Sequence, residues 1–227
     1  MAGDQFVEGA PAVVELQVAG EGGVPADASA ALLNIAAAQA TATGFVVAWP
    51  CGSAEPTAAS LNYVPGKPTS NSTIVKLGDD GKVCLRSSTP TDLIVDVNAA
   101  FPAQTDLTSF TPQRVLDTRS SQPSAAGGTT ELSITSQAGV PADSTAAVLN
   151  IAAAQAGDVG HVIAWPCGEE RPTAASLNYV AGEPVSNSTV VGIGAGGNVC
   201  LWTSSSVDLI VDINAAFVGN HTVDAFT

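Results

Sequence analysis

The sequence predicts an all-β chain of two tandem antiparallel β-sandwich domains, immunoglobulin-like or jelly-roll-like in kind, with at most one short helix per module. Two observations carry this prediction. Moving residues 13–101 forward by 116 positions places them on residues 129–217 without a gap, and 55 of the 89 pairs are identical. Such self-similarity marks a repeated folding unit. Each copy is also a series of short β-rich segments broken by Gly, Pro, Asn and Ser, which is typical of a sandwich or barrel.

The 227 residues suffice for two domains of roughly 100 residues, each with its own small core. We expect the first module over residues 1–104, a semi-rigid joint over residues 105–128 and the second module over residues 129–227. When the two copies are aligned, Met1 falls at the position equivalent to Asp117. We therefore expect either a two-module piece of a longer array or a two-module protein with a single joint.

Seven segments of the first copy predict strands, and the second copy repeats them. The last segment alternates best, because Leu93, Val95, Val97 and Ala99 share one face while Asp92, Ile94, Asp96 and Asn98 share the other. One apolar and one largely polar face is the pattern of a strand in a two-layer sandwich. In chain order the segments are residues 14–19, 30–39, 44–51, 60–64, 72–77, 82–88 and 92–101.

The alanine-rich segment at residues 28–40 fits the strand series least well. Asp27 is a candidate N-cap, and the alanines after it favour a helix by intrinsic propensity. Leu32, Leu33 and Ile35 make a poor helical stripe, however, and the segment leads directly into an evident strand. We interpret it as a strand, with one short helix per module as the alternative.

Four cysteines fall at equivalent places in the two copies, 33 residues apart within each copy. An even number placed identically in each module predicts one disulfide per module and an oxidising compartment. Buried free thiols are the alternative. Zinc is disfavoured because no C-x-x-C and no repeated histidine exists to complete a site. The predicted pairs are Cys51 with Cys84 and Cys167 with Cys200.

The joint contains the segment RVLDTR, whose alternation of charged and apolar residues suits a short edge strand. Its side chains Val115 and Leu116 would otherwise be exposed, so we expect the segment to pack on a module. The other module would then lack an equivalent strand and could accept one from a neighbouring chain by strand addition, giving homo-assembly. The candidate joint residues are Arg114, Val115, Leu116, Asp117 and Arg119.

The net charge is −14, from 21 acidic against seven basic residues. Binding to nucleic acid or anionic lipid requires a basic stripe, so both are disfavoured as partners. No stretch is apolar enough for a membrane span, and the first ten residues lack the regions of a signal peptide. We expect no membrane insertion.

Catalytic signatures are largely missing from the repeat. His161 aligns with Phe45 and His221 with Thr105, so no histidine belongs to the module. The sequence has no G-x-S-x-G, Walker loop or H-E-x-x-H. Repeated acids are read as solvated strand acids, with calcium as a weak alternative because hard cations take oxygen ligands. The weak calcium candidates are Asp92, Asp96, Asp208 and Asp212; otherwise we expect no metal and no cofactor.

Aromatic and amide side chains repeat together and form the other candidate site. Aromatic faces beside amides can hold sugars, yet with so few aromatics a small sandwich needs these rings for its core. Trp202 suggests exposure because it replaces Arg86. Both interpretations, core packing and ligand platform, stay open. The candidate platform is Trp49, Asn62, Tyr63, Trp165, Asn178, Tyr179 and Trp202.

Taken as a set, GVPADASAALLNIAAA, GFVVAWPCG, PTAASLNYVPG, KVCL, DLIVDVNAAF and FTPQRVLDTR resemble a tandem module of secreted and surface proteins of actinobacteria. The resemblance covers nearly the whole chain. It implies extracellular, β-rich, disulfide-bonded modules, each opened by RVLDTR, and brings no catalytic residue. The chain departs from it in having NIAAAQA where such modules show a strand richer in Thr and Val.

These observations predict a non-enzymatic extracellular or cell-surface module that serves as a spacer, a surface-fibre subunit or a cell-wall adhesion unit. Its partners would be other copies of the module or a cell-wall polymer. The alternative is a carbohydrate-binding module that directs an attached hydrolase to glycan. An enzyme would need a site present in only one copy, around His161, Glu169 or Glu170.

Overall fold

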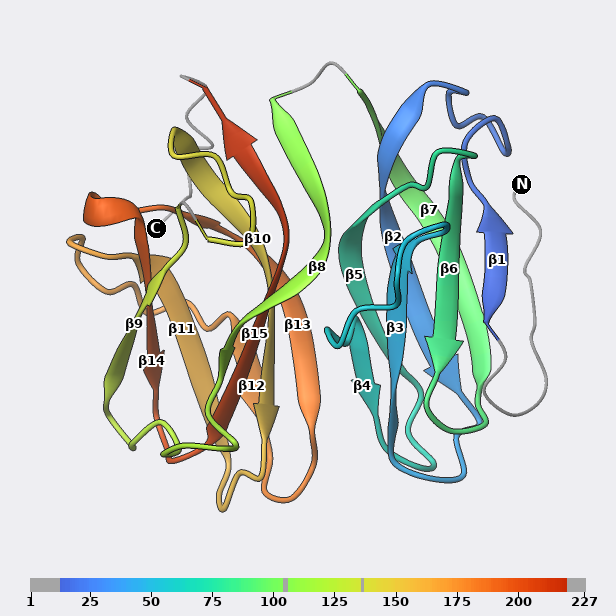
Figure 1. Ribbon diagram of the computed structural model, residues 1–227. Helices are drawn as coiled ribbons and strands as arrows, with labels where there is room; N and C mark the ends of the chain where they lie inside the picture. The colour runs from blue at the N-terminus through green and yellow to red at the C-terminus, as the bar shows by residue number, and fades with distance from the viewer. Residues whose placement is uncertain (1–12, 104–105, 136, 220–227) are drawn as a thin grey trace. The chain divides into compact units, whose positions relative to one another are not determined.

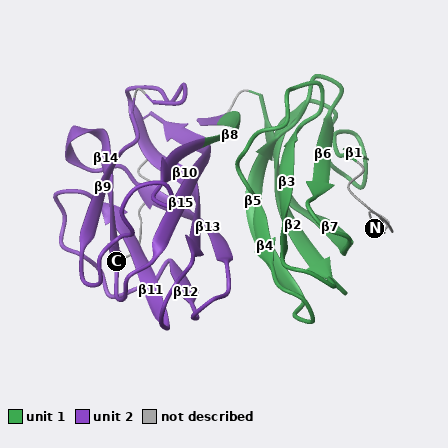
Figure 2. Cartoon of the chain, turned by 60° about the horizontal axis from the view of Figure 1, so that its bottom comes forward, with its two compact units in different colours: residues 1–105, 109–113 green, residues 106–108, 114–227 purple. Residues whose placement is uncertain are grey.

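The computed structural model describes residues 13–103, 106–135 and 137–219. Two compact units make up the chain, one of Met1–Thr105 with Ser109–Gln113 and the other of Asp106–Thr108 with Arg114–Thr227 (Figures 1 and 2). Each unit is a sandwich of two antiparallel sheets, so the predicted fold class is confirmed. Within the described residues there is no α-helix, and the one helical turn is the 3₁₀ segment Ala195–Gly197.

The first unit has one sheet with the strand order β1-β6-β3-β4 and a second sheet with the order β5-β2-β7. Within both sheets the neighbouring strands run antiparallel. The strands are β1 (Val14–Gln17), β2 (Ala28–Ala38), β3 (Gly44–Pro50), β4 (Leu61–Tyr63), β5 (Thr69–Lys76), β6 (Lys82–Ser87) and β7 (Asp92–Pro102).

The second unit repeats this plan and adds one strand, because its sheets have the orders β12-β11-β14-β9 and β13-β10-β15-β8. Strands β9 to β15 correspond to β1 to β7. Strand β8 (Leu107–Asp117) contains most of RVLDTR and has no counterpart among the described strands of the first unit. The others are β9 (Thr129–Ser133), β10 (Ser144–Ala154), β11 (Gly160–Pro166), β12 (Leu177–Tyr179), β13 (Val185–Gly192), β14 (Asn198–Thr203) and β15 (Asp208–Val218).

The alanine-rich segment is the central strand β2, so the strand interpretation is confirmed. It pairs with β5 on one side and with β7 on the other, which satisfies its backbone along both edges. Ala31, Leu33 and Ile35 are fully buried at 0% exposure, with less buried residues between them. This period of two places its apolar residues in the core, and that burial outweighs the helical preference of alanine.

The main core of the first unit lies between its two sheets and includes Leu33, Ile35, Val46, Leu61 and Leu85. A second, smaller cluster joins Val47 and Trp49 to the disulfide-forming Cys51 and Cys84. Val46 and Val47 are successive residues of one strand, and successive side chains of a strand point to opposite faces. The disulfide therefore braces the outer face of the sheet β1-β6-β3-β4.

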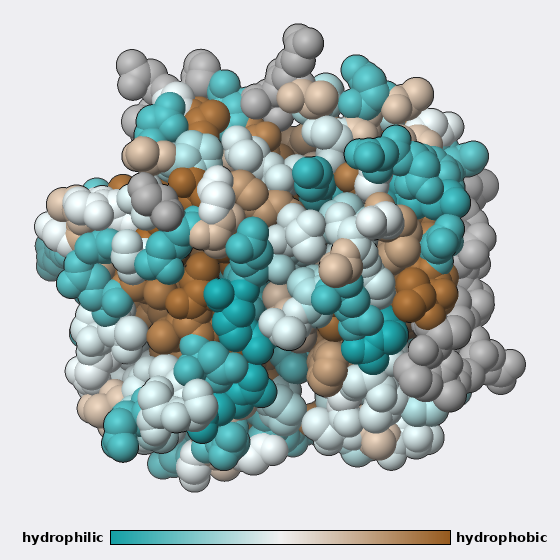
Figure 3. All heavy atoms as spheres, in the orientation of Figure 1, coloured by the Kyte–Doolittle hydropathy of each residue, from teal (hydrophilic) through white to brown (hydrophobic). Residues whose placement is uncertain are grey.

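Hydrophilic side chains cover much of the face drawn in Figure 3, and apolar side chains surface there in separate patches. In the described part of the chain, no helix is long and apolar enough to cross a membrane.

Candidate functional site

Strand β8 forms one edge of a sheet of the second unit, next to β15 (Figure 1). Near its start the N–H of Val218 donates to the carbonyl of Asp106 at 2.8 Å. At its far end the N–H of Thr118 donates to the carbonyl of Leu209 at 3.0 Å, and the N–H of Leu209 donates to Thr118 Oγ1 at 2.9 Å. The two strands thus run antiparallel. The predicted edge strand is present, and an edge is where a proline such as Pro112 is tolerated.

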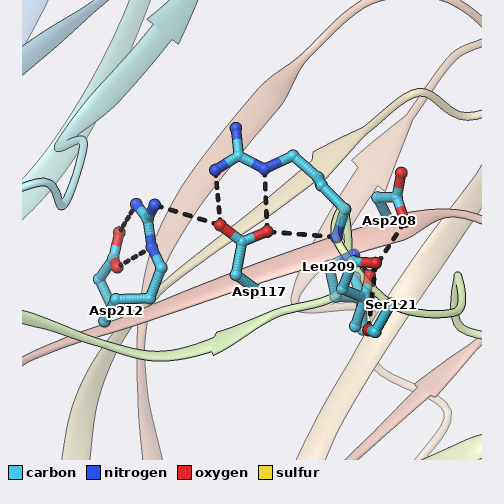
Figure 4. Close-up of polar contacts among 8 residues, drawn as sticks. Asp117, Ser121, Asp208, Leu209 and Asp212 are labelled. Carbon is cyan, nitrogen blue, oxygen red and sulfur yellow. Dashed lines mark hydrogen bonds and ion pairs between the residues drawn. The ribbon is translucent and has the colours of Figure 1, made fainter.

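A network of ion pairs joins RVLDTR to β15 (Figure 4). Arg114 holds Asp212 through two hydrogen bonds, Nε to Oδ1 at 2.9 Å and Nη2 to Oδ2 at 3.2 Å. Asp117 lies 3.4 Å from Arg114 Nη1 and accepts two further bonds from the Arg119 side chain, at 2.9 and 2.6 Å. A guanidinium that binds a carboxylate through two parallel bonds fixes direction as well as position.

Thr118 adds a neutral anchor beside the ion pairs. Its hydroxyl donates to Asp208 Oδ1 at 3.1 Å while accepting the Leu209 N–H, so one side chain engages both the backbone and a carboxylate of β15. Thr118 and Asp208 are buried, at 7% and 6% exposure. Arg114 and Thr118 thus bind two acids, Asp212 and Asp208, which lie four residues apart on β15.

The carboxylates of this network have opposite pKa shifts. Burial raises the pKa of Asp212, which is only 2% exposed, and its hydrogen bonds and ion pair with Arg114 oppose that rise. The hydrogen bond from Arg119 lowers the pKa of Asp117. Arg119 in turn has its pKa raised by the same hydrogen bond. Asp212 is therefore a buried charge that depends on Arg114 for compensation.

Of the predicted joint residues, the network brings together Arg114, Asp117 and Arg119, and it leaves Val115 and Leu116 half-buried in β8. Sequence reasoning did not identify Thr118, Asp208 and Asp212 as the partners of this segment. A signal was available, because the second copy contains a single basic residue, Arg171, whereas two of the seven basic residues lie in RVLDTR.

Of the weak calcium candidates in the second unit, Asp212 has both oxygens engaged by Arg114, and Asp208 accepts a hydrogen bond from Thr118. In the first unit Asp92 accepts a hydrogen bond from Gln39 Nε2 at 2.6 Å, and Asp96 is exposed. Across the described ranges no three His, Cys, Asp or Glu side chains gather as a metal ligand set.

The four repeated rings are buried, which favours core packing for these rings; the ligand platform stays a prediction. Trp49 and Trp165 are 4% and 8% exposed, and Tyr63 and Tyr179 are 1% and 2% exposed. Each tyrosine hydroxyl is tied down, that of Tyr63 to the Thr89 carbonyl and that of Tyr179 to the Ser205 carbonyl, both at 2.9 Å. Of the two amides, Asn62 is half-buried and Asn178 is exposed.

Trp202 is half-buried and takes part in a contact that differs between the copies. The Arg171 guanidinium lies 4.2 Å from the centre of its ring, a cation–π contact, and the His161 ring lies 5.4 Å away. At the equivalent places of the first unit, Arg86 Nε bonds the two carboxylate oxygens of Glu55 at 2.8 and 2.9 Å. An ion pair in one copy has thus become a cation–π pair in the other, with the contact kept.

Both predicted disulfides are present, linking Cys51 to Cys84 and Cys167 to Cys200. Across the sheet Trp49 is the register partner of Cys84, and Trp165 is the register partner of Cys200. Each tryptophan therefore packs beside the disulfide of its own unit. Disulfides of this kind are characteristic of an oxidising compartment.

A cavity of about 260 Å³ opens in the second unit beside Trp165. Its polar lining includes Glu169, Glu170, Asn187 and Thr189. Trp165 Nε1 donates to the carbonyl of Glu169 at 3.2 Å, which holds one wall of the cavity. In the first unit the residues equivalent to Asn187 and Thr189 are Asn71 and Thr73, which are buried at 3% and 1% exposure.

Comparison with known proteins matches no protein-family model and no curated protein. Among solved structures the chain is similar to the N-terminal CBM22-1-CBM22-2 tandem domain of Xyn10C from Paenibacillus barcinonensis. The identity is 10%, the TM-score is 0.26, and the match covers 95% of this chain and 94% of that chain. A TM-score of this size identifies no shared site.

Proposed function

We propose that the chain is a non-catalytic repeat module of an extracellular array, in which an RVLDTR strand connects successive modules and completes the sheet of the module that follows it. The observation that carries this proposal is the place of β8. Only residues 103–106 separate the end of β7 from the start of β8, and β8 is itself a strand of the second unit's sheet. The connection between the two strands is therefore short, as a spacer requires.

The other repeated features also support a structural role. Both disulfides brace a sheet, and the four repeated rings are buried. What the two copies hold in common is thus packing, cross-linking and strand pairing. Glu55 and Arg86 of the first copy are replaced by Arg171 and Trp202 in the second. The chemistry of the pair changes, but the two side chains remain in contact.

The proposal is tested by extending the array in phase. Appending residues 104–219 after residue 219 preserves the 116-residue repeat and supplies the third module with its own RVLDTR strand. We expect the maximum dimension in small-angle X-ray scattering to grow by a reproducible increment, with a third cooperative folding unit.

The control appends residues 120–219, which lack RVLDTR, and this version should give a less stable third unit and a broader distribution of distances. Equal stability and equal dimensions for the two extensions would contradict a connecting role for β8.

A second candidate function is carbohydrate binding at the cavity beside Trp165, which is favoured by its lining of carboxylates, an amide and a hydroxyl around an aromatic edge. Such groups hydrogen-bond sugar hydroxyls in small sites. A glycan array with the intact chain tests it, with Glu170→Gln as the variant and Glu131→Gln, on β9, as the matched control. Saturable binding that Glu170→Gln weakens would establish this function, and an array without signal would remove it.

A further inference from the structure

We propose that the open edge of β7 in the first unit is a binding site for a peptide segment of the β8 type, which adds to the sheet as a further strand. This inference rests on the proposed function, since it takes the pairing of β8 with β15 as the way in which a module is completed. It goes further in assigning a specific ligand and specific recognition residues to the first unit.

The edge itself is the first observation. β7 pairs with β2 on one side, and no described strand lies on its other side, whereas β15 has β10 on one side and β8 on the other. The exposure of the core-facing residues differs accordingly between the two strands. Val95 and Val97 are half-buried, but their counterparts Val211 and Ile213 are fully buried at 0% exposure. Among the described residues, the first unit's sheet thus has one strand fewer at this edge than that of the second unit.

The backbone of this edge is set to receive a strand. In the second unit both the N–H and the carbonyl of Leu209 point to β8, where they bond Thr118. Leu93 is the counterpart of Leu209, so its two backbone groups face the open edge of β7. Alternate residues of a strand direct their groups to the same side, which adds Val95 and Val97 to the row. An exposed row of this kind is a template for strand addition.

The side chains give the edge its preference for a β8-type strand. The five residues Asp92–Asp96 read DLIVD, identical to Asp208–Asp212, which hold RVLDTR in the second unit. Asp96 occupies the place of Asp212 and is exposed, with no arginine bound among the described residues. It is therefore positioned to take the arginine that Asp212 takes from β8. The ligand is an extended segment with Arg, then Asp three residues later, then Thr.

Asp92 is the counterpart of Asp208, which bonds Thr118. It already accepts a hydrogen bond from Gln39 Nε2 through one carboxylate oxygen. A carboxylate offers about four acceptor positions, so the other oxygen stays available to a threonine hydroxyl. Both acids that bind β8 in the second unit therefore have an identical counterpart at the edge of β7.

One contact is not reproduced. Val218 donates its N–H to the start of β8, but the equivalent residue of the first unit is Pro102, which has no N–H. The first residues of a bound segment should therefore add little to its affinity. The binding energy should come from the part that contains RVLDT.

The experiment measures binding of a fluorescently labelled peptide of residues 106–120, DLTSFTPQRVLDTRS, to the intact chain by fluorescence anisotropy. We expect saturable binding with one site per chain. Asp96→Asn should weaken it by roughly tenfold or more, as expected for loss of a charge-assisted pair. The matched control is Asp79→Asn, which removes the same charge from an exposed turn and should leave the affinity unchanged.

The peptide itself provides two further comparisons. A peptide with Arg114→Ala should lose affinity for the unaltered chain and show no additional loss with Asp96→Asn. A peptide of residues 110–120 should bind nearly as well as the longer one, because Pro102 lacks the N–H that Val218 donates to Asp106.

Failure of the peptide to bind the folded chain would overturn this inference, as would binding that Asp79→Asn weakens as much as Asp96→Asn. Self-association of the chain through paired β7 edges, unaffected by the peptide, would overturn it too. None of these results would alter the scattering result for the in-phase extension, so this inference and the proposed function fail separately.

Discussion

Replacing Arg114 by leucine tests the RVLDTR network most quantitatively. Leucine retains much of the apolar stem of Arg114 but leaves the Asp212 carboxylate, 3% exposed in its side chain, without its two hydrogen bonds. Removing one partner of a buried ion pair costs about 3–5 kcal/mol when both are fully buried. Arg114 itself is 22% exposed in its side chain, so we expect the lower end, about 3 kcal/mol at pH 7.

Protonation of Asp212 limits this cost and makes it depend on pH. Forcing a carboxyl with an unfolded pKa of about 3.9 to be neutral costs about 4 kcal/mol at pH 7 but only about 1.5 kcal/mol at pH 5. A folded pKa above the unfolded one gives a contribution that is complete below the unfolded pKa and is lost as pH rises through the folded value. The variant should therefore approach the parent in stability as pH falls from 7 to 5.

The assay is denaturant-dependent amide exchange of β15 by mass spectrometry at both pH values, which follows the second unit by itself. The control is Arg86→Leu with exchange followed in β6, because its partner Glu55 is 30% exposed in its side chain. Partly exposed pairs contribute about 0–1 kcal/mol with little pH dependence over this range. A loss below about 1 kcal/mol for Arg114→Leu at pH 7, or a loss that grows toward pH 5, would refute a buried, compensated Asp212.

Three further predictions concern the other features of the fold. Replacing Cys51 and Cys84 by alanine should destabilise the first unit by about 3–4 kcal/mol in the chain-entropy model, and calorimetry should show the other transition unmoved; a shift of both transitions would contradict independent cross-links. Asp117→Asn should be destabilising at neutral pH and progressively less so in acid, because the folded pKa of Asp117 is lowered and its contribution is lost as pH falls through that value; urea titrations at pH 7 and pH 3 measure this, and a difference that widens in acid would count against it. Converting Arg171 to Glu and Trp202 to Arg together should restore the pair seen in the first unit, with a coupling of about 0.5–1 kcal/mol over the single variants in a double-mutant cycle; additive effects would show that the two positions do not interact.

Much of the fold was predictable because it depends on local pattern. The alternation in residues 92–101 and the equal spacing of the four cysteines led directly to β7 and to both disulfides. The segment at residues 28–40 was ambiguous because alanine favours a helix, and only pairing with β5 and β7 on both sides decides for a strand.

The functional site was harder to predict because its partners are far apart in the chain. Arg114 and Asp212 are separated by 98 residues, and nothing local in RVLDTR indicates which module it completes. The burial of the repeated aromatic residues was hard to predict for the same reason. The sequence around a strand tryptophan does not show whether the ring faces solvent or, as for Trp49, a disulfide.

Native-state amide exchange of the intact chain, without any peptide, tests the central claim that β8 completes a sheet which the first unit leaves open. The amide of Leu209 bonds Thr118, and strand alternation turns those of Val211 and Ile213 to β8 as well. By equivalence, the amides of Leu93, Val95 and Val97 face the open edge. We predict exchange at least tenfold faster for these three amides of β7, since a free-energy difference of about 1.4 kcal/mol already gives that ratio and loss of a whole strand exceeds it. Equal protection of the two sets would contradict the account.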